Sequence, residues 1–216
     1  MYLPAHFAET RPEVLHALVR AYPLAAVVAP GADGLLAADH VPLLLDPGGA
    51  GAPGVLRGHV ARGNPIWRDR APGAQALAIF QGPQHYVSPN WYPSKKESGK
   101  VVPTWNYCCV HVNGTLRIHD DAAWVRRLVT ELTDAQESAS AHPWAVSDAP
   151  ADYLQAMIGQ IVGIEIVIER IAGKWKVSQN QPVHNRAGVV QGLQAAGTDR
   201  AEAMARLVDG KDPASR

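Results

Sequence analysis

Short apolar segments alternate with glycine- and proline-rich turns along this chain, and this alternation limits its fold more than any other feature. The 19 glycines and 17 prolines make up 36 of the 216 residues, which is above the share in an average globular protein. Short strands joined by tight turns are typical of antiparallel sheets, whereas parallel sheets need a long connection between strands. We therefore expect a mainly β protein with appended helices (α+β), built around an antiparallel barrel.

About eight strands are predicted from apolar alternation bounded by turn residues. The glycine-rich run Asp46–Gly54 is expected to be a flexible connection, because it lacks the G-x-x-x-x-G-K-[ST] pattern of a phosphate loop. Turns are also predicted at residues 31–34, at Gly82-Pro83, at Asn113-Gly114 and at Gly173. The expected strands are 24–29, 35–45 with an edge or bulge at Pro42, 54–61, 76–81, 85–88, the hairpin 110–118, 163–171 and 174–178.

Helices are predicted between and after these strands. Thr10-Arg-Pro-Glu13 is a capping box before an amphipathic run that Pro23 ends. Asp120 or Asp121 is expected to cap a second helix. A short helix at 148–158 and a last helix at 199–208, with Thr198 as its cap, complete the set, and the tail after residue 210 is expected to fray.

Charge and cysteine content exclude several classes of protein. Twenty basic residues balance twenty acidic ones, so no global field attracts DNA or an anionic membrane. The two cysteines, Cys108 and Cys109, are adjacent and form no disulfide framework. The N-terminus lacks the pattern of a signal peptide, and no apolar window approaches the ~18 residues needed to cross a membrane. We therefore expect a cytoplasmic protein.

Aromatic and polar side chains are concentrated between residues 80 and 107. Aromatic residues are only 6% of the chain, so their concentration here is a local feature. Rings suit the plane of a flat ligand, amides and hydroxyls suit its edge, and cations suit a phosphate. A packed surface loop with proline-fixed turns would give the same composition, so both interpretations stay open. The segment contains Tyr86, Ser88, Trp91, Tyr92, Ser94, Lys95, Lys96, Thr104, Trp105, Asn106 and Tyr107.

Several short motifs, in a fixed order, resemble the FMN-binding negative transcriptional regulator family (PaiB type). The resemblance covers residues 1–195 and implies a split β-barrel domain that binds FMN, usually as a homodimer; residues 196–216 would add a C-terminal helix and a frayed tail. The motifs are Met1-Tyr-Leu-Pro-Ala-His-Phe7, His40-Val-Pro-Leu-Leu44, Gly58-His-Val-Ala-Arg-Gly-Asn-Pro65, Tyr86-Val-Ser-Pro-Asn-Trp-Tyr92, Val102-Pro-Thr-Trp-Asn-Tyr107 and Lys176-Val-Ser-Gln-Asn180, with Gly82-Pro83 between the third and fourth.

A strand that enters a turn supplies the first candidate binding residues. Arg62 offers a fork of donors suited to phosphate oxygens. Asn64, at a helix start, presents its amide beside free backbone N–H groups. His59 shares a strand face with Arg57. A surface arginine beside a helix cap is the alternative, whereas the resemblance implies that this strand and turn contact the cofactor phosphate.

The segment at 104–107 begins a strand whose two faces differ. Trp105 and Tyr107 share one face, and Thr104 and Asn106 share the other. An isoalloxazine ring needs an apolar slot and hydrogen-bonding groups along its edge, which this strand could supply. A core strand with buried aromatics explains the same pattern.

Two lysine-containing segments complete the candidate site. Lys95 is favoured over Lys96 because it follows the turn at Pro93-Ser94. Lys176 and Gln179 lie at a strand end that is rich in donors. The resemblance implies a ligand or subunit contact for this strand end, which by itself indicates only a strand terminus.

The function that the resemblance implies is that of an FMN-binding negative transcriptional regulator, acting as a homodimer with the flavin at or near the subunit interface. No helix-turn-helix is evident and the charge is neutral, so the sequence gives no support to direct DNA binding. Regulation through a partner or through the redox state of the flavin is the alternative route.

Two other functions stay open. A flavin-dependent oxidoreductase could use the same barrel, with His59, His85 and Tyr86 as candidate proton donors. A haem or other planar ligand held through a histidine is the second. No metal site is expected, because no H-E-x-x-H or H-x-H spacing occurs, although His111 and His119 are expected on paired strands.

Overall fold

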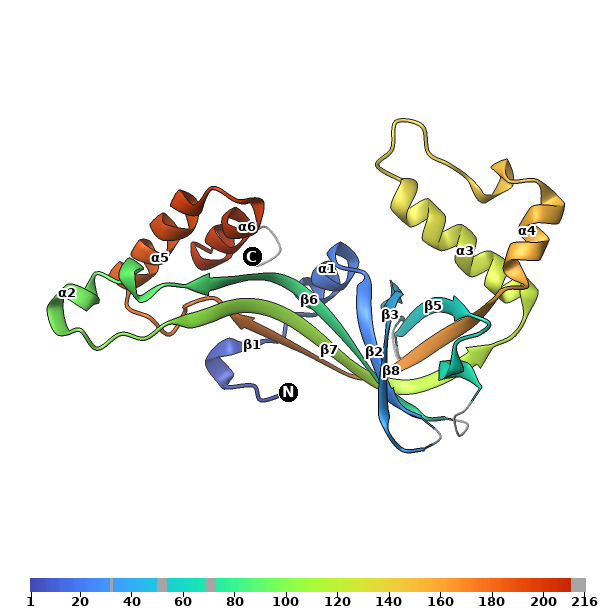
Figure 1. Cartoon of the computed structure of the whole chain (residues 1–216), viewed down its shortest axis with the longest axis horizontal. Coiled ribbons are helices and arrows are strands. Elements are labelled where there is room, and N and C mark those ends of the chain that lie inside the picture. The colour runs from blue at the N-terminus through green and yellow to red at the C-terminus, as the bar shows by residue number, and fades with distance from the viewer. Residues whose placement is uncertain (32, 50–53, 69–72, 211–216) are drawn as a thin grey trace. The chain divides into compact units, whose positions relative to one another are not determined.

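The computed structural model describes residues 1–31, 33–49, 54–68 and 73–210 (Figure 1). Within them, eight strands form one sheet in the order β3-β2-β6-β7-β8-β5-β4, and β1 pairs with β8. The strand pairs of defined register are antiparallel, as predicted. The strands are β1 (Ala8–Glu9), β2 (Leu24–Pro30), β3 (Leu36–Pro42), β4 (Leu44–Asp46), β5 (Val55–Ala61), β6 (Gln75–Val87), β7 (Thr104–His119) and β8 (Ile161–Lys176).

Helices are inserted between these strands and follow the last one (Figure 1). The predicted helices at the N-terminus, after Asp121, up to Ile158 and after Thr198 are confirmed. The predicted capping box at Thr10 is wrong, because Arg11 is the N-cap of the first helix and makes no side-chain cap hydrogen bond. The Glu9 carboxylate instead accepts hydrogen bonds from the backbone N–H groups of Thr10 and Arg11. The α-helices are α1 (Pro12–Ala21), α2 (Ser94–Ser98), α3 (Ala122–Glu137), α4 (Ala151–Ile158), α5 (Val183–Ala196) and α6 (Asp199–Val208), and the 3-10 helices are η1 (Ala5–Phe7), η2 (Pro65–Trp67), η3 (Pro89–Trp91) and η4 (Val146–Asp148).

The chain divides into two compact units. Unit 1 comprises residues 1–22, 80–111 and 171–216, and unit 2 comprises residues 23–79 and 112–170. Three of the boundaries between the units, after residues 79, 111 and 170, fall inside the long strands β6, β7 and β8. Each of these strands therefore contributes one part to each unit.

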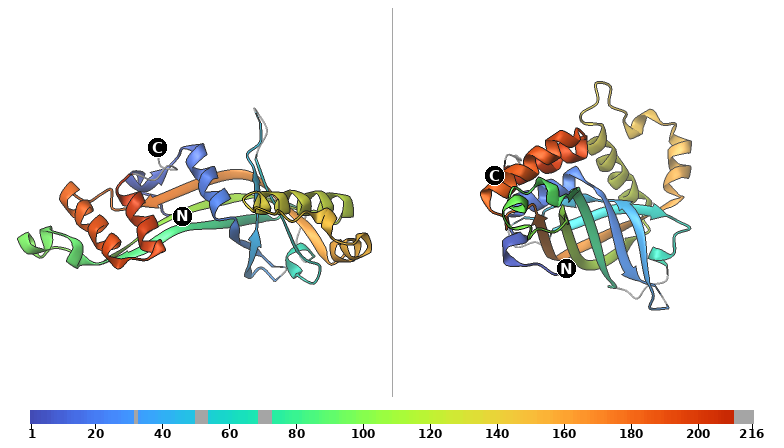
Figure 2. Two further views of the ribbon diagram at one scale, coloured as in Figure 1. Left: turned by 90° about the horizontal axis from the view of Figure 1, so that it is seen from above. Right: turned by 60° about the vertical axis from the view of Figure 1, so that its left-hand side comes forward.

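In unit 1, α1 packs on the sheet through its apolar face. Leu15 and Leu18 of this face are buried. Gly82 of β6 and Gly173 of β8 lie directly beneath them, where a Cβ atom would collide with a leucine methyl group. Helices α5 and α6 pack against each other (Figure 2), and α6 buries Met204 and Leu207.

In unit 2, β5 pairs with β8 over seven residues, and α3 contacts β5. The Asp121 side chain caps α3, accepting a hydrogen bond from the Trp124 backbone N–H at 2.6 Å. Val125 of α3 joins Leu154 and Ile158 of α4 in a buried apolar cluster. This cluster fixes the helices of the unit to one another by burial of apolar surface.

Three predicted turns are wrong, because the strands run straight through them. Gly82, Asn113-Gly114 and Gly173 lie inside β6, β7 and β8, and none of these glycines has a positive φ. A Cβ on Gly114 would collide with the Val167 carbonyl oxygen. These glycines therefore permit close approach of a neighbouring element, which is a second reason for glycine in a strand.

Smaller differences follow from the same long strands. His111 and His119 were expected on paired strands but lie on the same strand, β7. Pro42 ends β3, so the expected strand 35–45 is two strands, and β3 is an edge of the sheet, as expected of a strand that contains proline. Helices α2 and α5 were not predicted. Residue 32 of the first turn, residues 50–53 of the glycine-rich connection and the tail 211–216 lie outside the described residues.

Candidate functional site

A pocket of about 240 Å³ lies in unit 1, and we call it the polar pocket. Three segments form it: the stretch from the end of η3 through α2 to the loop beyond it, the first residues of β7, and the end of β8 with the loop that leads into α5. Most of its lining side chains carry an amide, a hydroxyl or an ammonium group. They are Tyr92, Ser94, Lys100, Val101, Val102, Thr104, Asn106, Lys176, Ser178, Asn180, Gln181 and Asn185.

One wall of the polar pocket is fixed by close packing on α5. Gly188 and Gly192 lie four residues apart and so share one face of this helix. A Cβ on Gly188 would collide with the Trp91 carbonyl oxygen, and a Cβ on Gly192 would collide with the Trp91 ring. The 3-10 turn that precedes the pocket therefore rests directly on the helix backbone.

Asn185 ties the same wall together by hydrogen bonds. It is only 3% exposed, and its Nδ2 donates to Ser94 Oγ at 2.9 Å and to Gln181 Oε1 at 3.2 Å. Its Oδ1 accepts from the Ser94 backbone N–H at 3.3 Å. Both ends of this amide are thus used within the protein, and we interpret Asn185 as a structural clamp between α2 and α5.

Asn106, the other buried amide of the pocket, is only half paired. It is 1% exposed, and its Nδ2 donates to Ser178 Oγ at 2.8 Å. Its Oδ1 is buried and has no hydrogen-bond partner among the described residues. An unsatisfied buried acceptor costs about 1–3 kcal/mol.

Ser178, the partner of Asn106, has a strained backbone. Its φ is 63°, which makes it the non-glycine residue with positive φ in the part of the chain that the structure describes. A non-glycine residue in the left-handed region costs about 1–3 kcal/mol and persists where the surroundings impose it. Strain and an unsatisfied acceptor thus lie side by side at this pocket, a combination that is typical of binding sites.

Lys176 is the inner cation of the polar pocket. Its Nζ donates to Thr104 Oγ1 and, at 2.8 Å, to the Trp105 carbonyl oxygen. Burial, and to a smaller extent repulsion from Lys174, lowers the pKa of this ammonium group. A nearby anion would oppose both effects by favouring the charged form.

Lys100 is the second cation, and it is exposed in the loop after α2. Among the described residues that line the pocket, none is aspartate or glutamate. The lining therefore carries positive charge together with hydroxyl and amide groups that both donate and accept hydrogen bonds. It suits an anionic ligand that also bears several polar groups.

Three residues predicted as cofactor-binding, Thr104, Asn106 and Lys176, line this pocket together. Gln179 lies next to it and supports the end of β8, since its Nε2 donates to the Trp175 carbonyl oxygen at 2.5 Å and its Oε1 accepts from the Val177 backbone N–H at 2.8 Å.

Trp105 and Tyr107 are not among the lining residues. Trp105 is 46% exposed, and its Nε1 donates to Gln84 Oε1 at 3.0 Å. The ring of Tyr107 lies under Lys174 Nζ, 5.4 Å from it. The alternation of β7 thus separates these two aromatic side chains from Thr104 and Asn106, as the sequence predicts.

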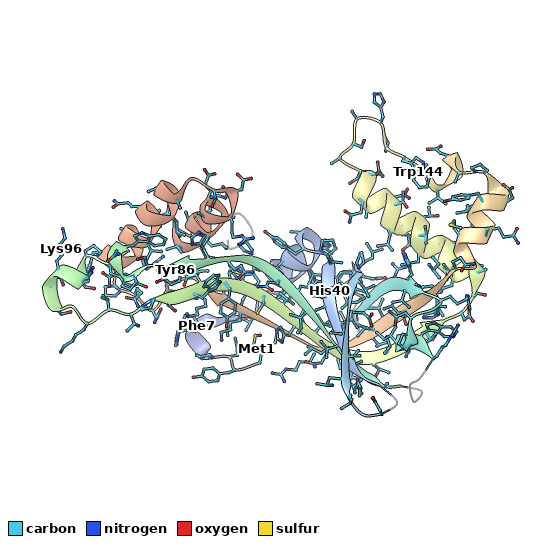
Figure 3. All side chains as sticks on the ribbon, in the orientation of Figure 1. Met1, Phe7, His40, Tyr86, Lys96 and Trp144 are labelled. Carbon is cyan, nitrogen blue, oxygen red and sulfur yellow. The ribbon has the colours of Figure 1, made fainter. Side chains whose placement is uncertain are left out.

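In the segment after η3, the sequence favours Lys95 as the binding cation, whereas the lysine that lines the pocket is Lys100. Lys95 Nζ donates to Asn90 Oδ1 at 2.5 Å and does not line the pocket. Lys96 is exposed at α2 (Figure 3). Lys100, which lines the pocket, lies in a loop that follows the left-handed Gly99 (φ 67°). No motif identified it, although a glycine after a short polar run is a signal for a helix end.

The remaining predicted residues lie in unit 2, where Arg62 already has partners. Its Nε donates to the Gly159 carbonyl oxygen at 2.7 Å, and its two terminal nitrogens bind the Asp120 carboxylate at 3.1 and 2.6 Å. This pairing lowers the pKa of Asp120. Arg62 thus joins the end of β5 to the residues that precede α3 and β8.

Asn64 and His59 flank this arginine along the chain. Asn64 Oδ1 caps η2 by accepting from the Ile66 backbone N–H at 2.8 Å, and its Nδ2 donates to Asp39 at 2.7 Å. His59 is largely buried, its Nδ1 has no partner among the described residues, and burial lowers its pKa. A phosphate at this place would have to displace Asp120 from Arg62.

Sequence comparison identifies the family. Residues 1–170 match the family model described as "Putative FMN-binding domain". The chain belongs to this FMN-binding family, as the motifs indicated. It is 30% identical to the protease synthase and sporulation protein PAI 2 of Bacillus subtilis, with 98% of each chain covered. It is 35% identical to an uncharacterized protein of Emericella nidulans, with 96% of each covered.

Comparison of structures supports the fold. The FAD and heme binding protein of Mycobacterium smegmatis superposes with a TM-score of 0.55 at 20% identity, over 78% of this chain and 73% of that one. The fold is therefore the split β-barrel that the resemblance implies. No helix in the described ranges is both long and apolar enough to cross a membrane.

Proposed function

We propose that this protein binds FMN in the polar pocket and acts as a regulatory flavoprotein. The observation that carries the proposal is the lining of the pocket: two lysines, a half-paired buried amide and several hydroxyl and amide groups, without a carboxylate among the described lining residues. Membership of an FMN-binding family supports the choice of FMN as the ligand.

The polar pocket fits one part of the cofactor better than the whole. Sites that enclose a complete drug-sized ligand have volumes of about 300–1,000 Å³, whereas this one has about 240 Å³. Lys100 and Lys176 would bind the phosphate, and the amide and hydroxyl groups would bind the polar chain. Bound FMN would supply reversible electron transfer, and the protein residues would orient it.

We further propose a homodimer, because the resemblance to the PaiB-type family implies this assembly. We also propose that it acts in the cytoplasm, because its two adjacent cysteines form no disulfide framework. The name of the Bacillus subtilis relative connects that protein with protease synthesis and sporulation. The formal net charge of zero gives no support to binding DNA by a general electrostatic surface. Regulation through a partner protein, or through the oxidation state of the flavin, therefore fits this chain better.

The first test is the visible absorption spectrum of the purified protein, before and after incubation with FMN and desalting. Retained bands near ~375 and ~450 nm support a flavin, and an intense band near ~400 nm supports haem instead. Reoxidation of the reduced flavin by an added substrate would favour an oxidoreductase. Absence of any retained chromophore would contradict the proposal.

A matched pair of lysine variants tests the place of binding. Lys100→Met and Lys95→Met each remove one ammonium group from neighbouring segments, but only Lys100 lines the pocket. We expect weaker FMN binding for Lys100→Met and unchanged binding for Lys95→Met, measured by quenching of flavin fluorescence. The reverse result would move the cofactor phosphate to Lys95, as the sequence alone suggests.

A further inference from the structure

The two buried asparagine side chains of the polar pocket differ in whether both of their polar atoms have hydrogen-bond partners. Asn185 uses both its oxygen and its nitrogen within the protein. Asn106 uses its nitrogen on Ser178 and leaves its buried Oδ1 without a partner among the described residues. Because buried acceptors are normally paired, the free oxygen of Asn106 indicates that the missing partner belongs to the ligand.

That missing partner must be a hydrogen-bond donor. An amide oxygen only accepts hydrogen bonds, so it cannot bind a phosphate dianion or a carbonyl group. A hydroxyl group donates, and hydroxyl groups occur along the sugar-alcohol chain of FMN. The surroundings of Asn106 are polar, with Ser178, Thr104 and Lys176 lining the same pocket, which suits such a chain better than an apolar ring.

The spacing of residues along β7 places the Lys176 ammonium group within reach of the same sugar-alcohol chain. Lys176 Nζ binds Thr104 Oγ1, and Thr104 lies two residues before Asn106 on one face of the strand. Residues two apart on a strand are about 6.6 Å apart along it. A ligand with a hydroxyl at Asn106 and an anionic end at Lys176 therefore needs only a few carbon–carbon bonds between them.

We infer that the polar pocket selects a phosphorylated sugar-alcohol chain, with a chain hydroxyl donating to Asn106 Oδ1 and a terminal phosphomonoester between Lys100 and Lys176. This inference rests on the proposed function, because it assumes that a flavin is the ligand. It makes Asn106 a specificity-determining residue for the chain, and the two lysines the residues that recognise the phosphate.

Three flavins separate these contributions. FMN carries the chain and the phosphate, riboflavin carries the chain alone, and lumiflavin lacks both. Equilibrium dissociation constants from fluorescence quenching give two ratios for each protein variant. The dissociation constant of lumiflavin divided by that of riboflavin reports the contribution of the sugar-alcohol chain to affinity. The dissociation constant of riboflavin divided by that of FMN reports the contribution of the phosphate.

Each variant should change one ratio and leave the other. In Asn106→Ala we expect the lumiflavin-to-riboflavin ratio of dissociation constants to fall by a factor of about 5 to 150, because riboflavin no longer gains affinity by pairing a buried acceptor that the free protein leaves unpaired. Lys176→Met should lower the riboflavin-to-FMN ratio by about 10-fold to 150-fold, the range for hydrogen bonds to a charged group. Equal losses for all three flavins in both variants would overturn the inference.

Two controls keep the result interpretable. Asn106→Ala leaves Ser178 Oγ without its donor, so Asn106→Ser is measured beside it, and a folded variant of either kind serves. If wild-type protein binds lumiflavin as tightly as riboflavin, the inference fails while flavin binding stands. If wild-type protein binds none of the three flavins, the proposed function itself fails.

Discussion

Ser178, the strained serine of the polar pocket, gives a prediction about its substitution by alanine and by glycine. The usual order of stability of these two variants should be reversed at this position. Ser178 is 3% exposed and has a φ of 63°. At ordinary helix or strand positions, glycine is less stable than alanine by about 0.5–1 kcal/mol. At a left-handed position, alanine retains a strain of about 1–2 kcal/mol that glycine does not have.

The magnitude follows from comparing the two variants with each other. Ser178→Ala and Ser178→Gly both lose the hydrogen bond from Asn106 Nδ2, so this loss cancels in the comparison. The strain then favours Ser178→Gly by about 1–2 kcal/mol, and the greater freedom of glycine in the unfolded chain opposes it by about 0.4–1 kcal/mol. We expect Ser178→Gly to be more stable than Ser178→Ala by about 1 kcal/mol.

The assay is equilibrium unfolding in urea, with the free energy of unfolding of each variant obtained by linear extrapolation. Equal slopes for the two variants would show that the denatured states are comparable. If Ser178→Ala proves as stable as Ser178→Gly or more so, the backbone at this position is not strained, and the interpretation of Ser178 as a strained residue of the polar pocket is refuted.

Three further substitutions test other parts of the account. Gly192→Ala, normally stabilising in a helix, should lower the free energy of unfolding by about 1–3 kcal/mol and weaken FMN binding, because the new methyl group collides with the Trp91 ring; a rise in melting temperature would contradict this. Arg62→Ala should lower the melting temperature and leave FMN affinity unchanged, since its donors bind Asp120 and Gly159; weaker FMN binding in a folded variant would restore Arg62 as a phosphate ligand. Burial lowers the pKa of His59 in the folded protein. As the pH falls below about 6.5, the unfolded chain is therefore protonated before the folded one, and the free energy of unfolding decreases. Urea titrations from pH 8 to 5 should show a smaller decrease for His59→Gln than for the wild type, and an equal decrease would exclude His59 as a contributor.

Three helix starts and the sheet class could be predicted from the sequence because their signals are local, whereas the cap predicted at Thr10 is wrong. Thr198, Asp121 and Asn64 each cap the helix that the sequence assigned to them. The predicted turn at Asn113-Gly114 is wrong, because glycine occurs both in tight turns and where another backbone approaches closely, and a single sequence does not distinguish the two. Gly114 provides room for the backbone at Val167, a residue far away in the chain, and only the tertiary structure distinguishes this use from a turn.

The candidate site was predictable to a similar extent. Thr104, Asn106 and Lys176 were singled out because donors are dense where β7 begins and β8 ends, and the structure brings these two strand ends together. Lys100 and Asn185 were missed because nothing in their own neighbourhood predicts their position. Asn185 lies in α5, where it begins a buried stripe continued by Val189 and Leu193, while Gly188 and Gly192 contact Trp91. A polar residue at the start of such a stripe is not revealed by apolar periodicity.

The most direct test of the account is a crystal structure of the protein grown with FMN. We predict that the phosphate lies against Lys176 and Lys100 and that a hydroxyl of the chain donates to Asn106 Oδ1. Density for the phosphate at Arg62 in unit 2, with the polar pocket filled only by water, would contradict the account.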